Sequence, residues 1–265
     1  MNEQAAYWDN VYQHIGSKRQ SPFTQAKHDC ILAALPEDAV SILDAGCGGG
    51  ALLAALKQLG RGSIEGMDLS PEGVNFVRDE LGVAARVGSV LDMNEYDDNS
   101  FDLVICSEVT EHLHDDELPV CYKELCRVAK KYVLVTNPYN EDLRYHQILC
   151  FHCHSSFHAA GHIQRVDEEF QRRYFGPYSN ETAFHYSGRR EKRYASYAAF
   201  VRRCGRNVLF REGMTCSQCQ RLIEKRPWPV WLRGVGKAYQ SWQTILLRLG
   251  AYEPANLITL ATLPQ

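Results

Sequence analysis

Short apolar segments alternate with helix-forming runs along the first half of this chain. Each apolar segment ends in glycine or in polar residues, as the buried strands of a parallel sheet do. Residues 51–56, after the first segment, are strong helix formers. The segments that predict strands are 42–45, 64–69, 100–106, 130–136 and, far along the chain, 256–262. This alternation predicts an α/β fold.

The first predicted strand runs directly into a glycine-rich turn. Asp44 ends the strand and precedes Gly46, Gly48 and Gly50. Glycine lets the backbone approach a ligand closely, and the helix that follows presents free N–H groups. The carboxylate of Asp44 would repel a diphosphate at short range but suits a cationic or amine-bearing ligand. The turn therefore favours a positively charged nucleoside over a dinucleotide.

A second acidic residue ends the next predicted strand. Asp68 follows Asp44 by 24 positions and precedes Ser70 and Pro71. Alone, this acid also fits NAD binding, or a helix that begins at Ser70. In order with the glycine-rich turn, it indicates that the site holds an adenosine-containing ligand.

The pattern Asp44-x-Gly46-x-Gly48-x-Gly50 resembles motif I of the class I S-adenosylmethionine-dependent methyltransferases, and the resemblance extends over roughly residues 1–140. It implies a Rossmann-like, doubly wound sheet of seven strands with an antiparallel last strand, preceded by N-terminal lid helices. It also implies S-adenosylmethionine as cofactor, with Asp68 accepting hydrogen bonds from the ribose hydroxyls. The cofactor-binding residues that the resemblance implies are Asp44, Gly46, Cys47, Gly48, Asp68, Leu69, Ser89, Val90 and Ser107.

One position departs from the family pattern. Relatives usually carry Asp before the fourth strand, where it accepts a hydrogen bond from the adenine amine, whereas this chain has Ser89. A hydroxyl accepts such a bond more weakly than a carboxylate does. Asp92 is an alternative acceptor.

In relatives, the stretch after the family's fourth strand, which corresponds to residues 100–106 here, lines the methyl-transfer pocket. It implies Glu108 and His112 as candidate catalytic residues, with His162 or His158, further along, as other candidate general bases. The alternative is that His112 only begins a helix. Asn137-Pro138-Tyr139 is similar to a motif of amino-group methylases but lies one strand too late, so we interpret Pro138 as the residue that ends the strand predicted at 130–136.

More than a hundred residues separate the strand predicted at 130–136 from the one predicted at 256–262, so the chain carries an insertion. We expect lid helices and the cofactor-binding core in residues 1–145. The substrate and cysteine insertion, with strand six, is expected in 146–255, and the last core strand in 256–265.

Two Cys-x-x-Cys pairs lie in this insertion, Cys150/Cys153 and Cys216/Cys219. Four thiolates suit tetrahedral Zn²⁺, and a site with four thiolates has no open position for catalysis. Members of the family with a similar Cys-x-x-Cys, a Phe, a Gly-His and a distant second Cys-x-x-Cys imply the same arrangement here. We therefore expect a structural zinc. The alternatives are reduced thiols, a redox-active pair, or a histidine in place of one cysteine.

Composition indicates the compartment in which we expect this protein. The chain has 265 residues, 45% of them hydrophobic, which is enough for one substantial core and an embellishment. It lacks an apolar run of the roughly 20 residues that span a membrane. Its first residues do not read as a signal peptide, and it has ten cysteines. These features predict a cytoplasmic protein with reduced or metal-bound cysteines. They do not predict an oligomeric state.

The charge is unevenly divided along the chain. Residues 1–150 contain 12 Lys and Arg against 24 Asp and Glu, whereas residues 151–265 contain 17 against 8. The basic part attracts anionic partners, or it is a solvated helix face. We expect a methyltransferase acting on a hydroxyl, amine or carbon of a small or medium-sized acceptor, anionic acceptors included. The alternatives are an RNA or protein methyltransferase and a non-catalytic cofactor-binding or zinc-scaffolded interaction protein.

Overall fold

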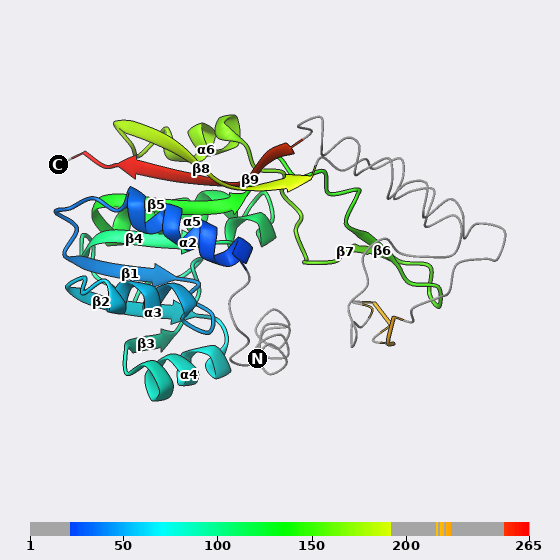
Figure 1. Cartoon of the computed structure of the whole chain (residues 1–265), viewed down its shortest axis with the longest axis horizontal. Helices are drawn as coiled ribbons and strands as arrows, with labels where there is room; N and C mark the ends of the chain where they lie inside the picture. Colours follow the sequence, from blue (N-terminus) through cyan, green and yellow to red (C-terminus); the bar gives the residue numbers. More distant parts are fainter. Residues whose placement is uncertain (1–21, 192–215, 217, 220, 224–251, 265) are drawn as a thin grey trace. The chain divides into compact units, whose positions relative to one another are not determined.

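The computed structural model describes residues 22–191, 216, 218–219, 221–223 and 252–264 (Figure 1). The chain divides into two compact units. Unit 1 comprises Met1–Tyr139, Val166–Gly188 and Ala255–Gln265, and unit 2 comprises Asn140–Arg165 and Arg189–Pro254. The predicted boundaries differ from this division, because they assigned residues 166–188 to the insertion.

Unit 1 is built on one sheet of seven strands, in the order β3-β2-β1-β4-β5-β9-β8. The pairs β1–β2, β1–β4, β2–β3 and β4–β5 are parallel, whereas β9 pairs antiparallel with β5. The strands are β1 (Ser41–Ala45), β2 (Ser63–Asp68), β3 (Ala84–Val87), β4 (Phe101–Ser107), β5 (Ala129–Pro138), β8 (Glu181–Glu191) and β9 (Tyr252–Thr262). The predicted Rossmann-like sheet with an antiparallel last strand is confirmed.

Successive residues of the central strands face opposite sides of the sheet, and each side has its own core. Leu43 of β1 packs with α5 and α6, whereas its neighbour Ile42 packs with α2, α3 and α4. The helices of unit 1 are α2 (Pro22–Ala34), α3 (Ala51–Gln58), α4 (Pro71–Leu81), the short 3-10 helix η1 (Thr110–His112), α5 (Leu118–Val128) and α6 (Glu168–Phe175). The result is a three-layer α/β/α unit whose central strands are buried on both faces.

The start of α4 shows how local sequence sets the elements around the site. The hydroxyl of Ser70 accepts a hydrogen bond from the Gly73 amide at 3.1 Å, and Pro71 occupies the first turn. The cap that the sequence suggested is therefore present, and β2 ends two residues before it. This abrupt change of direction leaves Asp68 at the carboxyl edge of the sheet.

The described part of unit 2 contains one hairpin, formed by β6 (Gln147–Leu149) and β7 (Ser156–His158). A small apolar cluster of Ile148, Cys150, Cys216 and Ile223 packs beside it. Most of the basic residues of the segment 151–265 lie outside the described residues.

Candidate functional site

The parallel strands bring several predicted residues to one edge of the sheet. β1 has β2 on one side and β4 on the other, so the chain crosses over in opposite directions from this point. Ligands of open α/β sheets bind at such switch points, outside the carboxyl ends of the strands. Asp44, Asp68, Ser89 and Glu108 end or follow β1, β2, β3 and β4.

The glycine-rich turn is hydrogen-bonded to the end of β2. The amides of Gly46 and Cys47 donate to the Met67 carbonyl at 2.7 and 3.0 Å. The Gly48 amide donates to the Asp68 carboxylate at 2.7 Å, and the Ser70 amide donates to its other oxygen at 2.9 Å. The structure therefore brings together the two motifs that the sequence singled out.

Asp44 is a buried carboxylate beside this turn. Its side chain is 2% exposed, and its Oδ1 atom has no hydrogen-bond partner among the described residues. Burial, together with the nearby charge of Asp68, raises the pKa of Asp44 to about 7 against an opposing effect of Lys27. Two acids at this edge make a site that a cationic ligand would neutralise. S-adenosylmethionine, which carries a sulfonium and an ammonium group, fits this charge.

The raised pKa of Asp44 predicts how stability depends on pH. The folded state holds the proton more tightly than the unfolded chain, whose carboxyl has the usual value of 3.8. Stability should therefore fall as the pH rises from about 4 to about 7, by an amount on the order of 4 kcal/mol, and stay level above that. Asp44→Asn should remove this decline. Urea unfolding across that pH range measures it, with the exposed Asp97→Asn as control, and an unchanged slope in Asp44→Asn would contradict the assignment.

Two glycines of the turn differ in the space around them, which gives a matched pair of variants. Gly46 has φ of +91°, and a Cβ there would overlap Val109 Cγ2, whereas a Cβ at Gly49 would meet nothing within 4 Å. Gly46→Ala should therefore lower stability by about 3 kcal/mol, from backbone strain and overpacking. Gly49→Ala should leave stability within about 1 kcal/mol. If the cofactor occupies the open space beside Gly49, calorimetry should show that Gly49→Ala binds the cofactor more weakly although it is stable.

Glu108 follows β4 in a left-handed backbone conformation, with φ of 59°. Such strain in a residue other than glycine clusters at functional sites. Its carboxylate accepts a hydrogen bond from the Thr136 hydroxyl at 3.2 Å and lies 3.5 Å from the ammonium of Lys27 in α2. Lys27 is buried. It could not be predicted from the sequence, because one lysine in an ordinary helix gives no signal.

The other predicted residues of unit 1 occupy less distinctive positions. Ser107 shares a 2.8 Å hydrogen bond with Thr136. The Ser89 hydroxyl accepts a hydrogen bond from the Leu91 amide at 3.1 Å, and Val90 packs in the core. Leu69 lies between β2 and the cap of α4, and His112 ends η1. Their roles toward the cofactor or the acceptor stay predictions.

His162 lies in unit 2, where it contacts a carboxylate that the sequence analysis missed. The Nδ1 atom of His162 is hydrogen-bonded to one carboxylate oxygen of Glu141 at 2.6 Å, and the Nδ1 atom of His146 is hydrogen-bonded to the other. The Oε1 atom of Glu141 lies 3.7 Å from His158 Nε2. Burial opposes ionisation of Glu141, but the hydrogen bonds from His146 and His162 hold its pKa well below the usual range. The group is therefore a charged carboxylate surrounded by imidazoles. Nothing in the spacing of residues 141, 146, 158 and 162 predicted it.

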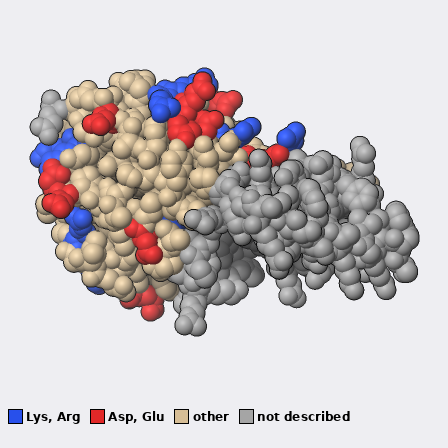
Figure 2. Space-filling model, turned by 45° about the horizontal axis from the view of Figure 1, so that its top comes forward, with Lys and Arg blue, Asp and Glu red and all other residues tan. Residues whose placement is uncertain are grey.

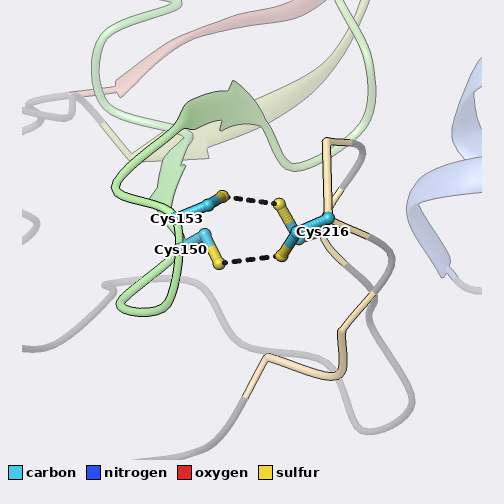
Figure 3. Close-up of side chains that lie close together, drawn as sticks. Cys150, Cys153 and Cys216 are labelled. Atoms are coloured by element: carbon cyan, nitrogen blue, oxygen red, sulfur yellow. Dashed lines mark hydrogen bonds between the residues drawn. The ribbon is translucent and has the colours of Figure 1, made fainter.

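The four predicted metal ligands come together in unit 2 (Figure 3). The Sγ atoms of Cys150 and Cys219 lie 3.7 Å apart, and those of Cys153 and Cys216 lie 3.6 Å apart. Tetrahedral zinc with Zn–S bonds of about 2.3 Å needs S···S separations of about 3.8 Å. All four sulfur atoms lie within 4.8 Å of one another, and the nine described cysteines are free of disulfides.

The surroundings of Cys216 suit a metal ligand. The Gln218 amide lies 3.4 Å from its sulfur, and the Ser155 hydroxyl lies 3.3 Å from it. Although burial acts in the opposite direction, these hydrogen bonds help to lower the pKa of Cys216 to about 6. A thiolate at neutral pH is the form that binds metal. The donor set and its geometry therefore fit structural zinc.

Comparison with known families agrees with the geometry of unit 1. The family described as "Methyltransferase domain" matches residues 43–135, from β1 to β5. Over these residues the chain is therefore similar to methyltransferase domains. The match includes the turn at Asp44, the acid at the end of β2 and the strained Glu108.

Curated relatives match about a third of the chain. A ubiquinone biosynthesis O-methyltransferase of Xanthomonas campestris pv. campestris is 37% identical over 92 residues, which cover 33% of this chain and 38% of the relative. A protein of the same name from Xanthomonas euvesicatoria pv. vesicatoria is 42% identical over 79 residues, covering 28% of this chain and 33% of the relative. The matches thus span well under half of the length of these relatives.

A solved structure resembles much more of the chain. A SAM-dependent methyltransferase from Archaeoglobus fulgidus covers 96% of this chain and 100% of its own, with a TM-score of 0.57 and 14% identity. At this identity the likeness supports the fold of the methyltransferase domain and nothing about the acceptor.

Proposed function

We propose that this chain is an S-adenosylmethionine-dependent methyltransferase that acts on a hydroxyl, amine or carbon of a small or medium-sized acceptor. The observation that carries the proposal is the buried Asp44 carboxylate, whose Oδ1 has no partner among the described residues, beside a turn of the methyltransferase domain. A buried charge of this kind is costly unless a ligand neutralises it. A structural carboxylate would have its hydrogen bonds supplied by the protein.

Each site residue then has a proposed part in binding. Asp44 faces the cationic end of the cofactor, and the backbone of Gly46, Cys47 and Gly48 lies along it. The carboxylate of Asp68 accepts hydrogen bonds from the ribose. Contacts with the rest of the nucleoside and with the methyl group come from Leu69, Ser89, Val90 and Ser107.

When bound, S-adenosylmethionine supplies a methyl group activated by a positively charged sulfur. The protein's part is to hold the acceptor atom in line with that methyl group and to exclude water. A hydroxyl acceptor also loses its proton as the new bond forms, so a general base contributes. Glu108, His112 and His162 are the proposed groups for these tasks.

Hydroxyl acceptors are the first to test, because the curated relatives are named O-methyltransferases. Figure 2 shows acidic and basic side chains interspersed on the visible face of the described residues, without a broad patch of one sign. Among the described residues, none of the helices is both long and apolar enough to cross a membrane. A cytoplasmic location stays a prediction.

Calorimetry with S-adenosylmethionine, followed by a methyl-transfer screen, tests the proposed function. The screen covers phenols, sugars, carboxylates, amines, RNA and protein. Micromolar cofactor binding with transfer to a small hydroxyl compound is the expected result. Transfer only to RNA or protein would establish the alternative acceptor class. Binding without any transfer would indicate a non-catalytic binding protein, and absence of binding would overturn the proposal.

We further propose that Cys150, Cys153, Cys216 and Cys219 hold a structural Zn²⁺. The paired sulfur distances support it, as does the position of Cys150 and Cys216 in the small apolar cluster of unit 2. Two hairpin strands of three residues each bury too little apolar surface to be stable alone. A metal would supply the missing stabilisation.

A further inference from the structure

Asn137, which ends the fifth strand together with Pro138, is completely buried, and its side chain contacts three others. Its Nδ2 atom donates to Thr110 Oγ1 at 2.8 Å and to Glu111 Oε2 at 2.8 Å. Its Oδ1 atom accepts a hydrogen bond from Gln171 Nε2 at 2.7 Å. Both ends of this amide are therefore engaged inside unit 1.

The hydrogen bonds continue beyond Asn137 into the helices. Gln171 of α6 accepts a hydrogen bond from the Tyr122 hydroxyl of α5 at 2.9 Å. Burial raises the pKa of Tyr122 well above its ordinary value, so the phenol stays a donor. Tyr122, Gln171 and Asn137 are all at most 1% exposed, and Glu111 is 1% exposed.

The direction of this chain of hydrogen bonds is fixed by its last member. A carboxylate only accepts, so Asn137 must present its NH2 group to Glu111. Gln171 must then donate to the Asn137 carbonyl, and Tyr122 to the Gln171 carbonyl. Every donor points toward Glu111, and such chains polarise one another in the direction of the charge. The arrangement is therefore suited to holding a negative charge on Glu111.

A merely structural residue at position 111 would not need this arrangement. Replacing a buried charged group by an apolar one of similar volume is often neutral or stabilising. Glu111 instead sits three residues after the strained Glu108, beyond the carboxyl end of β4, in a methyltransferase domain. Buried carboxylates with built support at such an edge are candidates for function.

We propose that Glu111 is a charged residue on the acceptor side of the active site, and that Asn137, Gln171 and Tyr122 are positioning residues that act through it. This inference rests on the proposed methyltransferase function. The sequence pattern Asn137-Pro138-Tyr139 thus acquires a role: Asn137 orients a carboxylate of the protein, and Pro138 ends the strand.

Kinetics of single and double variants test the inference. Glu111→Gln should lower kcat about 100-fold, as loss of a charged group in the reaction does. Asn137→Leu should lower kcat about tenfold. In both variants the cofactor Kd should stay within about threefold of wild type, because the site of action is the acceptor side. Wild-type turnover by Glu111→Gln would overturn the inference.

A double variant separates positioning from general destabilisation. If Asn137 acts through Glu111, then Asn137→Leu should cost less than about twofold in kcat when Glu111→Gln is already present. A full tenfold loss in that background would contradict the inference. Tyr122→Phe removes only the far hydroxyl and keeps the ring packing. It should lower kcat about threefold without loss of fold, so it serves if Asn137→Leu does not fold.

Infrared spectroscopy provides a measurement that does not need turnover. The difference spectrum between wild type and Glu111→Gln at neutral pH should contain a carboxylate band, and that band should shift in Tyr122→Phe. A protonated carboxyl band instead would overturn the inference. If the wild type transfers no methyl group, the proposed function fails while this spectrum still decides whether the chain holds Glu111 charged.

Discussion

Cys150→Ser protein is expected to lose its zinc and, with it, the folded hairpin of unit 2. Structural zinc contributes an apparent binding free energy of roughly 10–16 kcal/mol in small zinc-dependent folds, far more than the apolar cluster around Ile148 and Ile223 can replace. A hydroxyl in place of one thiolate leaves three sulfur ligands and an open position. Cys219→Ser should behave in the same way.

Metal analysis and hydrogen exchange together measure this effect. The wild type should contain about one zinc per chain, and amides of β6 and β7 should lose protection in the variant or with a chelator. Cys30→Ser is the matched control, since Cys30 is a half-buried cysteine of α2 outside the cluster. A metal-free wild type with a fully protected hairpin would overturn the zinc proposal.

Asp68→Ala is expected to weaken S-adenosylmethionine binding by about 100-fold. Hydrogen bonds to a charged group contribute about 1.5–3 kcal/mol each, and the proposed ribose contacts end on this carboxylate. In the wild type, the Gly48 amide donates to the Asp68 carboxylate at 2.7 Å and holds the turn. The variant loses this hydrogen bond as well. Both effects weaken cofactor binding, the first directly and the second by loosening the turn.

Stability of the cofactor-free protein should change much less. Asp68→Ala loses two backbone hydrogen bonds but relieves the repulsion with Asp44, which contributes to the raised pKa of that residue. Calorimetry and urea unfolding on the same samples separate binding from stability. Glu72→Gln, at the exposed start of α4, is the control. If Asp68→Ala binds S-adenosylmethionine with wild-type affinity, the cofactor assignment is wrong.

The central sheet could be predicted because its strands carry their own signal. Buried parallel strands are apolar throughout, as in residues 42–43 and 103–106, and a glycine-rich turn between a strand and a helix is typical of nucleotide-binding sheets. The order of the strands came from the family resemblance. The strand β8 carried no such signal, because its sequence includes Glu181, Ser187 and Arg189 among apolar residues.

The side chains that support the site could not be predicted from the sequence, for a different reason. Asn137, Gln171 and Tyr122 are ordinary residues in ordinary elements, and only the packing of α5 and α6 on the sheet brings them together. Glu141 likewise depends on the path of the chain through unit 2. Local pattern identifies residues that shape the backbone, whereas partnerships between distant polar side chains follow from tertiary structure.

The contact between Gly46 and Val109 limits how this sequence can change. The side chain of Val109 fills the volume that a Cβ at position 46 would need. A smaller residue at 109 would remove only this overlap, because the φ of +91° strains any side chain at position 46, so glycine should be kept there among homologues. Libraries built to alter the pocket should therefore keep Gly46 and vary position 109 instead, because variants changed at position 46 would be removed by misfolding before their effect on activity could be seen.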